Sequence, residues 1–142
     1  MSLNEIYTEL IRYHNKNRAN KKEIKDATIS ERGHNPSCGD DITLYIKIDK
    51  DIIIDAGFTG SGCAISQAST SIMIDLIKDK NINEVGDILE TFLKMIRKEM
   101  QDENKLDLLG DAFYLRNISN MPARVKCVVL PWHSLKVSLE KL

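Results

Sequence analysis

The stretch ITLYIKIDKDIIIDAGF, residues 42–58, decides the fold of this chain. Residues Ile42 to Ile48 alternate apolar and polar side chains, which is the pattern of a strand with one buried face. Asp49-Lys50-Asp51 is typical of a turn, and the three consecutive isoleucines in Ile52 to Phe58 favour a second strand. The stretch therefore predicts two antiparallel strands joined by a tight turn, and residues 27–30 are expected to add a short third strand.

Helical periodicity surrounds this hairpin. Apolar residues recur at helical spacing from Leu3 to Ile11, so a helix is expected to open the chain. Further apolar helix faces follow at Ile65–Ile77, Val85–Met100 and Leu106–Phe113. A last helix is predicted to begin near Met121-Pro122, because proline suits the first turn of a helix. Strands followed by helices predict an α+β domain with about five helices.

Length and composition narrow the class of protein. The 142 residues suit a single domain spanning 1–142, and 42% hydrophobic residues can fill its core. The net charge of -1 shows no excess of basic residues of the kind that binds nucleic acid or an anionic membrane surface. No apolar run approaches the ~20 residues of a membrane span, and the N-terminus lacks the pattern of a signal peptide. We therefore expect a cytoplasmic protein without nucleic-acid or membrane partners.

Several other stretches carry structural expectations. The basic segment 14–25 is expected to be a solvated loop, and residues 57–62, rich in glycine, a flexible loop that brings its backbone close to a bound ion or partner. His14 and His133 are expected at the surface. If the last helix continues past Pro131, the missing N–H should kink it, and Trp132 is expected to pack on the core.

Three cysteines and one aspartate are the candidate functional residues. Cys38 lies in a turn-rich stretch, Cys63 at the start of a helix, and Cys127 about one and a half turns into the last helix. An odd number of thiols excludes a full disulfide framework, and thiolates together with the Asp40 carboxylate are ligands that zinc accepts. The spacing matches no zinc finger, so buried, chemically inert thiols remain the alternative, above all for Cys127. His34 is a further candidate ligand.

Three blocks of sequence carry a family resemblance. They are Asn35-Pro-Ser-Cys-Gly-Asp40, Gly60-Ser-Gly-Cys-Ala-Ile-Ser-Gln-Ala-Ser-Thr-Ser71 and Met121-Pro-Ala-Arg-Val-Lys-Cys127. In order and content they resemble the signature blocks of the SufU/IscU family, the NifU N-terminal-like proteins of iron–sulfur cluster assembly. The block Arg124-Val-Lys-Cys127 is similar to the SufU branch, since IscU-type scaffolds carry a histidine where this chain has Lys126.

The resemblance implies a fold, a site and a function. The fold is a small antiparallel sheet packed on one side by helices, and the site is one zinc ion bound by Cys38, Asp40, Cys63 and Cys127. A SufU-type protein accepts persulfide sulfur from a pyridoxal-phosphate-dependent cysteine desulfurase of the SufS type. The resemblance makes Cys38 the acceptor, which a desulfurase histidine displaces from the zinc, and makes Arg124 a partner-binding residue.

Two other functions stay open at this point. The same cysteines and Asp40 would serve a scaffold that holds iron or a [2Fe-2S] cluster for downstream assembly proteins, or a structural zinc site without chemistry. Lys126 and the long segment between the second and third cysteines favour a zinc-dependent sulfurtransferase, an enzyme-like role, over the scaffold. Structural zinc sites are closed and chemically inert. Cys38 is flanked by glycine in a turn-rich stretch, which argues against a structural zinc site.

Overall fold

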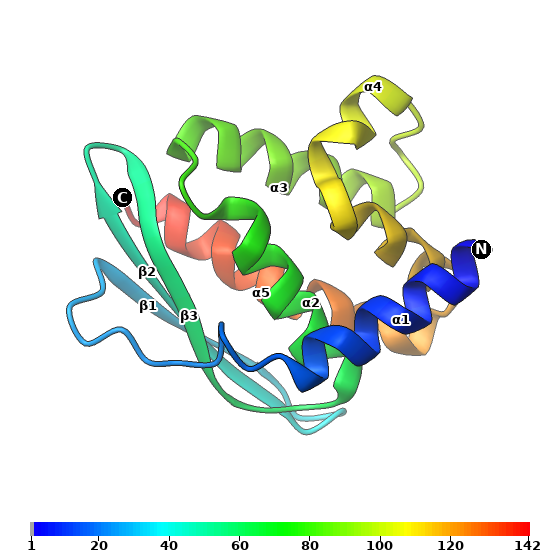
Figure 1. The fold of residues 1–142 in the computed structure, drawn as a ribbon, viewed down its shortest axis with the longest axis horizontal. Coiled ribbons are helices and arrows are strands. Elements are labelled where there is room, and N and C mark those ends of the chain that lie inside the picture. Colours follow the sequence, from blue (N-terminus) through cyan, green and yellow to red (C-terminus); the bar gives the residue numbers. More distant parts are fainter. Residues whose placement is uncertain (1) are drawn as a thin grey trace.

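A computed structural model describes residues 2–142 of the chain (Figure 1). Three strands and their helices follow one another along the chain. In order they are α1 (Leu3–Lys16), β1 (Ile29–Asn35), β2 (Asp40–Asp49), β3 (Ile52–Ser61), α2 (Ala64–Ile77), α3 (Ile82–Ile96), α4 (Glu103–Leu106), the 3₁₀ segment η1 (Asp107–Asn120) and α5 (Pro122–Glu140). The α+β class predicted from the sequence is confirmed.

The sheet is antiparallel in the order β1-β2-β3. Its centre is the predicted hairpin, in which Asp49 pairs with Ile52, and the turn residues Lys50 and Asp51 have φ values of 50° and 65°. Positive φ at both turn positions gives the twist that a two-residue hairpin needs. The third strand also exists, but it covers Ile29–Asn35 instead of the predicted residues 27–30.

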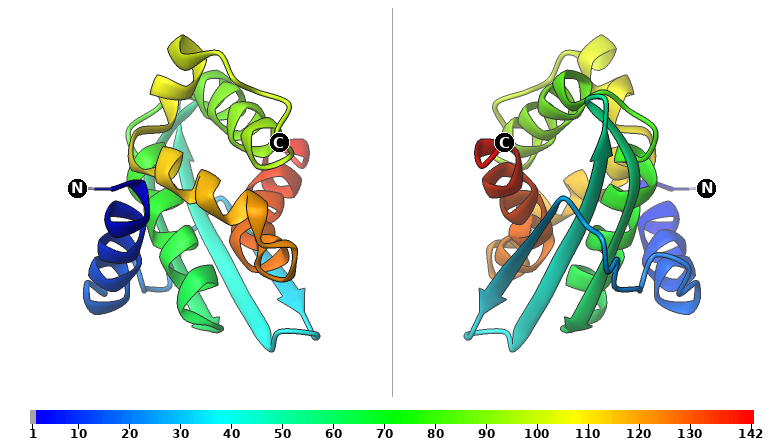
Figure 2. Two further views of the ribbon diagram at one scale, coloured as in Figure 1. Left: turned by 90° about the vertical axis from the view of Figure 1, so that its right-hand side faces the viewer. Right: turned by 90° about the vertical axis from the view of Figure 1, so that its left-hand side faces the viewer.

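The helices cover one face of the sheet, as the two side views in Figure 2 show. Alternate residues of β2, including Leu44 and Ile46, are buried on this face, where α5 packs against β1 and β2 and α2 packs against β3. Behind them Trp132 of α5 stacks on Phe92 of α3, with 3.7 Å between the ring centroids and no exposed surface on either ring. The expected core position of Trp132 is confirmed.

The expected loop at residues 57–62 is mostly strand, because β3 continues to Ser61. Gly60 has φ +110°, and a Cβ there would lie 2.0 Å from the carbonyl oxygen of Asp41 on β2. A Cβ at Gly57 would lie 2.5 Å from the carbonyl oxygen of Lys22. The glycines therefore let neighbouring backbone approach β3 closely, which is a packing role and not flexibility.

The bounds of the later helices differ in part from those expected. As predicted, α5 starts at Pro122, and it continues through Pro131 as one helix to Glu140. The helix predicted over Val85–Met100 is shorter at its end, since α3 ends at Ile96. The helix predicted over Leu106–Phe113 consists of the end of α4 and part of the 3₁₀ segment, which is interrupted at Gly110 (φ 50°, ψ -131°). No helix among residues 2–142 combines the length and apolar character of a membrane span.

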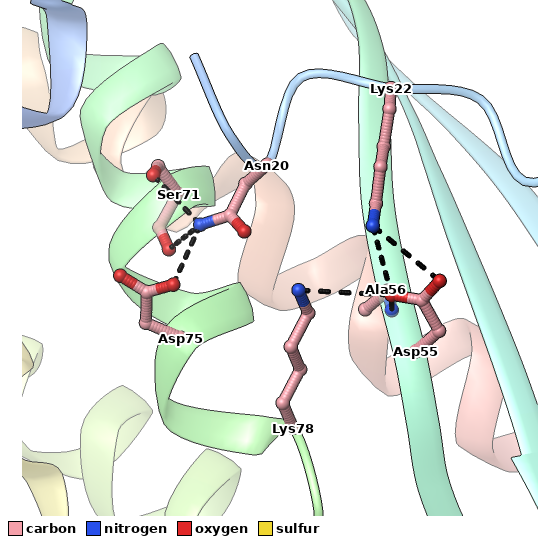
Figure 3. Close-up of polar contacts among 7 residues, drawn as sticks. All are labelled: Asn20, Lys22, Asp55, Ala56, Ser71, Asp75 and Lys78. Atoms are coloured by element: carbon pink, nitrogen blue, oxygen red, sulfur yellow. Dashed lines mark hydrogen bonds and ion pairs between the residues drawn. The ribbon is translucent and has the colours of Figure 1, made fainter. Parts of the chain in front are cut away.

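The basic segment 14–25 was expected to be a solvated loop, but residues 14–16 belong to α1, and the loop that follows is held in place by hydrogen bonds and an ion pair (Figure 3). The buried Asn20 side chain donates from Nδ2 to the Ser71 carbonyl oxygen, at 3.1 Å, and to Asp75 Oδ1, at 2.8 Å. The backbone carbonyl oxygen of Asn20 accepts from the Phe58 N–H at 3.0 Å. Lys22 forms an ion pair with Asp55 of β3. The segment thus joins α1 to both α2 and the outer edge of β3.

The expected surface position of His14 is wrong. Its side chain is buried between α1 and α2, with Nδ1 2.7 Å from the Ser71 hydroxyl oxygen, whereas His133 is exposed as expected. The sequence pattern misses this because a single histidine on a polar helix turn gives no sign of burial. Burial lowers the pKa of His14, and Asp75 and Asp111 oppose that shift.

A pH prediction follows from the lowered pKa of His14. The unfolded chain binds this proton more tightly than the folded one. The stability that neutral His14 contributes is therefore present above about pH 6.5 and is lost as the pH falls toward the folded-state pKa. Urea unfolding of the reduced, metal-free protein should show a smaller loss of stability between about pH 7 and 5 in His14→Gln than in wild type. Equal losses in the two proteins would contradict this.

Candidate metal centre

Cys38 lies in the turn that joins β1 to β2. The turn is closed by the Cys38 N–H, which donates to the Asn35 carbonyl oxygen at 3.2 Å, and by Gly39 at φ +70°. The Cys38 thiol is exposed, as its turn-rich surroundings suggest. Asp40 is the first residue of β2 and is fully buried, so the turn places an exposed thiol next to a buried carboxylate.

The other two cysteines come from helices. Cys63 is the N-cap of α2, and its Sγ accepts a hydrogen bond from the Ser66 N–H at 3.4 Å. Cys127 is buried in the second turn of α5. Since α5 packs against β1 and β2, Cys127 reaches the end of the sheet at which the β1–β2 turn lies.

The structure brings three of the four expected ligands together. Ligand atoms of Cys38, Asp40 and Cys127 all lie within 4.8 Å of one another. Within residues 2–142 neither Cys63 nor His34 belongs to this group. Cys63 nevertheless lines the same groove as Cys38 and Cys127, and its N–H is bonded to Asp40. The candidate centre is therefore a cluster of three ligands with Cys63 at its border.

The Asp40 carboxylate has one satisfied and one free oxygen. Oδ1 accepts from the Cys63 N–H at 2.9 Å and from the Ser66 hydroxyl at 3.0 Å. Oδ2 is buried and has no hydrogen-bond partner within the described residues. A buried carboxylate oxygen without a partner carries a desolvation cost that a bound cation would remove. Thiol sulfurs and one carboxylate oxygen suit zinc, so the residues present fit that ion.

A further negative charge in the cluster is unfavourable without a cation. Burial raises the pKa of the Cys127 thiol well above its usual value, and the neighbouring Cys38 and Cys63 thiols and the Asp40 carboxylate raise it further. Each of these neighbours disfavours a second negative charge. Metal binding to Cys127 would therefore release a proton.

A groove of about 710 Å³ runs from the cysteines between α1, α2 and the start of α5. Apolar side chains such as Ile11 and Ile65 line much of it, and the exposed Arg124 stands on its wall beside Tyr7. Burial raises the pKa of Tyr7, while the Arg124 guanidinium lowers it through charge and a side-chain hydrogen bond. The exposed Arg124 and the exposed Cys38 thus line the same groove.

Sequence reasoning missed Tyr7 and Ser66. Tyr7 belongs to the apolar face of the first helix, which indicates a core residue, and its side chain is indeed buried. Ser66 is one of several serines in α2, and nothing in a single sequence marks which of them faces Asp40. The capping position of Cys63 supplies the only signal, because the residue three positions after an N-cap faces back toward it.

Comparison with known proteins finds relatives that agree with one another. The family model for the NifU-like N-terminal domain matches residues 6–128. The chain is 41% identical over 137 residues to the iron-sulfur cluster assembly scaffold protein IscU of Thermotoga maritima, covering 96% of this chain and 94% of that protein. It is 39% identical over 140 residues to the zinc-dependent sulfurtransferase SufU of Bacillus subtilis, covering 99% and 93%.

Solved structures agree with these relatives. The chain superposes with a TM-score of 0.87 and 40% identity on a protein of Fervidobacterium islandicum AW-1 that is described as a cluster assembly scaffold for the SUF system, over 95% of this chain and 97% of that one. A NifU-like N-terminal structure from Brucella abortus superposes with a TM-score of 0.82 at 18% identity, covering 99% and 96%, and supports the fold alone. The predicted small antiparallel sheet packed by helices is confirmed.

Proposed function

The chain belongs to the family of NifU-like N-terminal domains, the SufU/IscU family, and within it we propose a zinc-dependent sulfur acceptor of iron–sulfur cluster assembly. The observation that carries the proposal is the placement of Cys38. Its thiol is exposed at a groove, yet it lies within 4.8 Å of a buried carboxylate and a buried thiol. An acceptor needs both features, because it must be reachable by a donor and activated as a thiolate.

Four residues would hold the zinc ion. Cys38, Asp40 and Cys127 form the cluster, and Cys63 at its border would complete the set. When bound, the ion supplies positive charge that keeps ligand thiols deprotonated at neutral pH. Asp40 offers Oδ2, the oxygen that has no donor among the described residues.

The chemistry of sulfur acceptance falls to Cys38. Its thiolate attacks the outer sulfur of a persulfide on a cysteine desulfurase of the SufS type. The sulfur–sulfur bond of the donor breaks, the donor cysteine leaves as a thiolate, and Cys38 becomes the persulfide. No net oxidation occurs, since one sulfur–sulfur bond replaces another. Arg124, exposed on the groove wall, contacts the docked desulfurase, and downstream iron–sulfur assembly proteins take the sulfur.

The proposal extends to the whole chain and its compartment. Residues 1–142 act as one domain, since the family match and the relatives span most of the chain. Its three thiols are all free in the structure. Free thiols persist in a reducing compartment, which supports placing the protein in the cytoplasm.

Desulfurase turnover tests the proposal. Alanine release from cysteine, measured with the desulfurase of the same source, should rise several-fold and saturate as zinc-loaded protein is added. Arg124→Ala should need a higher concentration for half of that effect at unchanged zinc content, because it removes only a contact at the groove wall. No acceleration by protein with a full complement of zinc would overturn sulfur acceptance.

The second candidate is a cluster scaffold, because the relative from Thermotoga maritima carries that name. A scaffold purified without oxygen would hold a coloured [2Fe-2S] cluster, whereas a zinc protein is colourless. Lys126, in place of the histidine of IscU-type scaffolds, favours the zinc-dependent acceptor.

A further inference from the structure

The Ser66 hydroxyl lies between two of the proposed zinc ligands. It donates to Asp40 Oδ1 at 3.0 Å, and its oxygen is 3.1 Å from the Cys63 carbonyl oxygen and 3.6 Å from Cys63 Sγ. Its backbone N–H also donates to Cys63 Sγ. Ser66 is fully buried, so no water competes for these contacts.

The surrounding backbone is built to allow this contact. A Cβ at Gly62 would lie 2.5 Å from the Ser66 hydroxyl oxygen and 2.6 Å from Asp40 Oδ1. Any larger residue at this position would therefore press on both groups. The chain thus keeps open the space through which Ser66 reaches the carboxylate.

Both donors to the Asp40 carboxylate bind the same oxygen. The Cys63 N–H and the Ser66 hydroxyl bond to Oδ1, whereas Oδ2 is buried without a partner. Two donors on one oxygen fix the rotation of a carboxylate and leave the other oxygen free for a cation. Removing a group that orients a metal ligand in this way typically weakens metal binding by about 10- to 100-fold.

We propose that Ser66 is a positioning residue of the metal centre, which holds Asp40 by Oδ1 so that Oδ2 is presented to the ion. The role rests on the proposed function only in taking Asp40 and Cys63 as zinc ligands. The α2 helix then has two tasks, since it carries Cys63 as its N-cap and Ser66 as the residue that orients Asp40.

Zinc affinity, measured by competition with a chromophoric chelator on the reduced full-length chain, tests this role. Ser66→Ala should weaken zinc binding by about 10- to 100-fold. The matched control is Ser71→Ala, which removes another buried hydroxyl of α2, one that lies 2.7 Å from His14 Nδ1 and accepts from Asn20 Nδ2. It should lower stability in urea yet leave zinc affinity within about threefold of wild type, because Ser71 contacts neither a proposed ligand nor a neighbour of one.

A second comparison shows whether Ser66 acts through Asp40. In the Asp40→Ala background the added Ser66→Ala change should alter zinc affinity by less than about twofold, since no carboxylate remains to be positioned. An unchanged affinity in Ser66→Ala alone, or the same loss with and without Asp40, would overturn the proposal. If Ser66→Ala does not fold, Gly62→Ala disturbs the same contact from its other side and should weaken zinc binding likewise.

The result is separable from that of the proposed function. Zinc affinity is measured without a desulfurase, so the positioning role stands or falls whether or not the zinc-loaded protein accelerates that enzyme.

Discussion

Replacing Cys38 by alanine is expected to lower sulfur acceptance by about 100-fold or more, to the background of the assay, because the nucleophile is lost. The fold should stay intact. The thiol is exposed, and the one backbone hydrogen bond of the residue, from its N–H to Asn35, does not involve the side chain. In the reduced, metal-free proteins, free energies of unfolding of the variant and the wild type should therefore agree within about 0.5 kcal/mol.

Transfer of isotopically labelled sulfur from the desulfurase to the protein measures this effect directly. Ser37→Ala is the control, because it truncates the exposed neighbour of Cys38 in the same turn and leaves every proposed ligand in place. Both variants are compared after zinc loading and metal analysis, so that lost zinc is not read as lost nucleophile. Wild-type transfer by Cys38→Ala would remove Cys38 from the mechanism.

The largest stability effect is expected for Trp132→Ala, at about 3–5 kcal/mol. Trp132 has no exposed surface, stacks on Phe92, and donates from Nε1 to the Ser69 hydroxyl oxygen at 3.0 Å. Its removal would leave a cavity between α3 and α5 and would take away the donor from which the Ser69 hydroxyl oxygen accepts. Because α5 also carries Cys127, the loss would extend toward the candidate metal centre.

Urea unfolding followed by circular dichroism measures this loss, since Trp132 is the single tryptophan and fluorescence disappears with it. Trp132→Phe keeps an aromatic ring and removes the donor, so it should cost less than the alanine variant. Val137→Ala, at an exposed position of the same helix, should stay within about 0.5 kcal/mol of wild type. A loss below about 1 kcal/mol in Trp132→Ala would contradict the described core.

Periodic burial explains which parts of the fold were predictable. The β2–β3 hairpin has one buried face and alternates accordingly, and Pro122 marks the start of α5. The β1 strand is at the edge and mostly polar, so hydrophobic alternation does not reveal it. The end of β3 was hidden because Gly57 and Gly60 suggest a loop, although they serve close backbone packing.

The four candidate ligands came from the resemblance and not from the spacing of the cysteines. Cys38, Asp40 and Cys127 converge only because α5 packs on the sheet beside the β1–β2 turn, which is a tertiary relation. The contribution of Ser66 depends on a hydrogen bond between separate segments. Side-chain networks of this kind leave no periodic trace in a sequence.

The tie between Asn20 and Phe58 has a consequence for self-association. Edge strands with unpaired backbone groups are templates for joining one molecule to another. Here the loop after α1 occupies the Phe58 N–H at the β3 edge, and the β1 edge carries the charged side chains of Glu31 and Arg32, both in ion pairs. These contacts disfavour strand addition at the two edges of the sheet, so the protein should resist aggregation at high concentration.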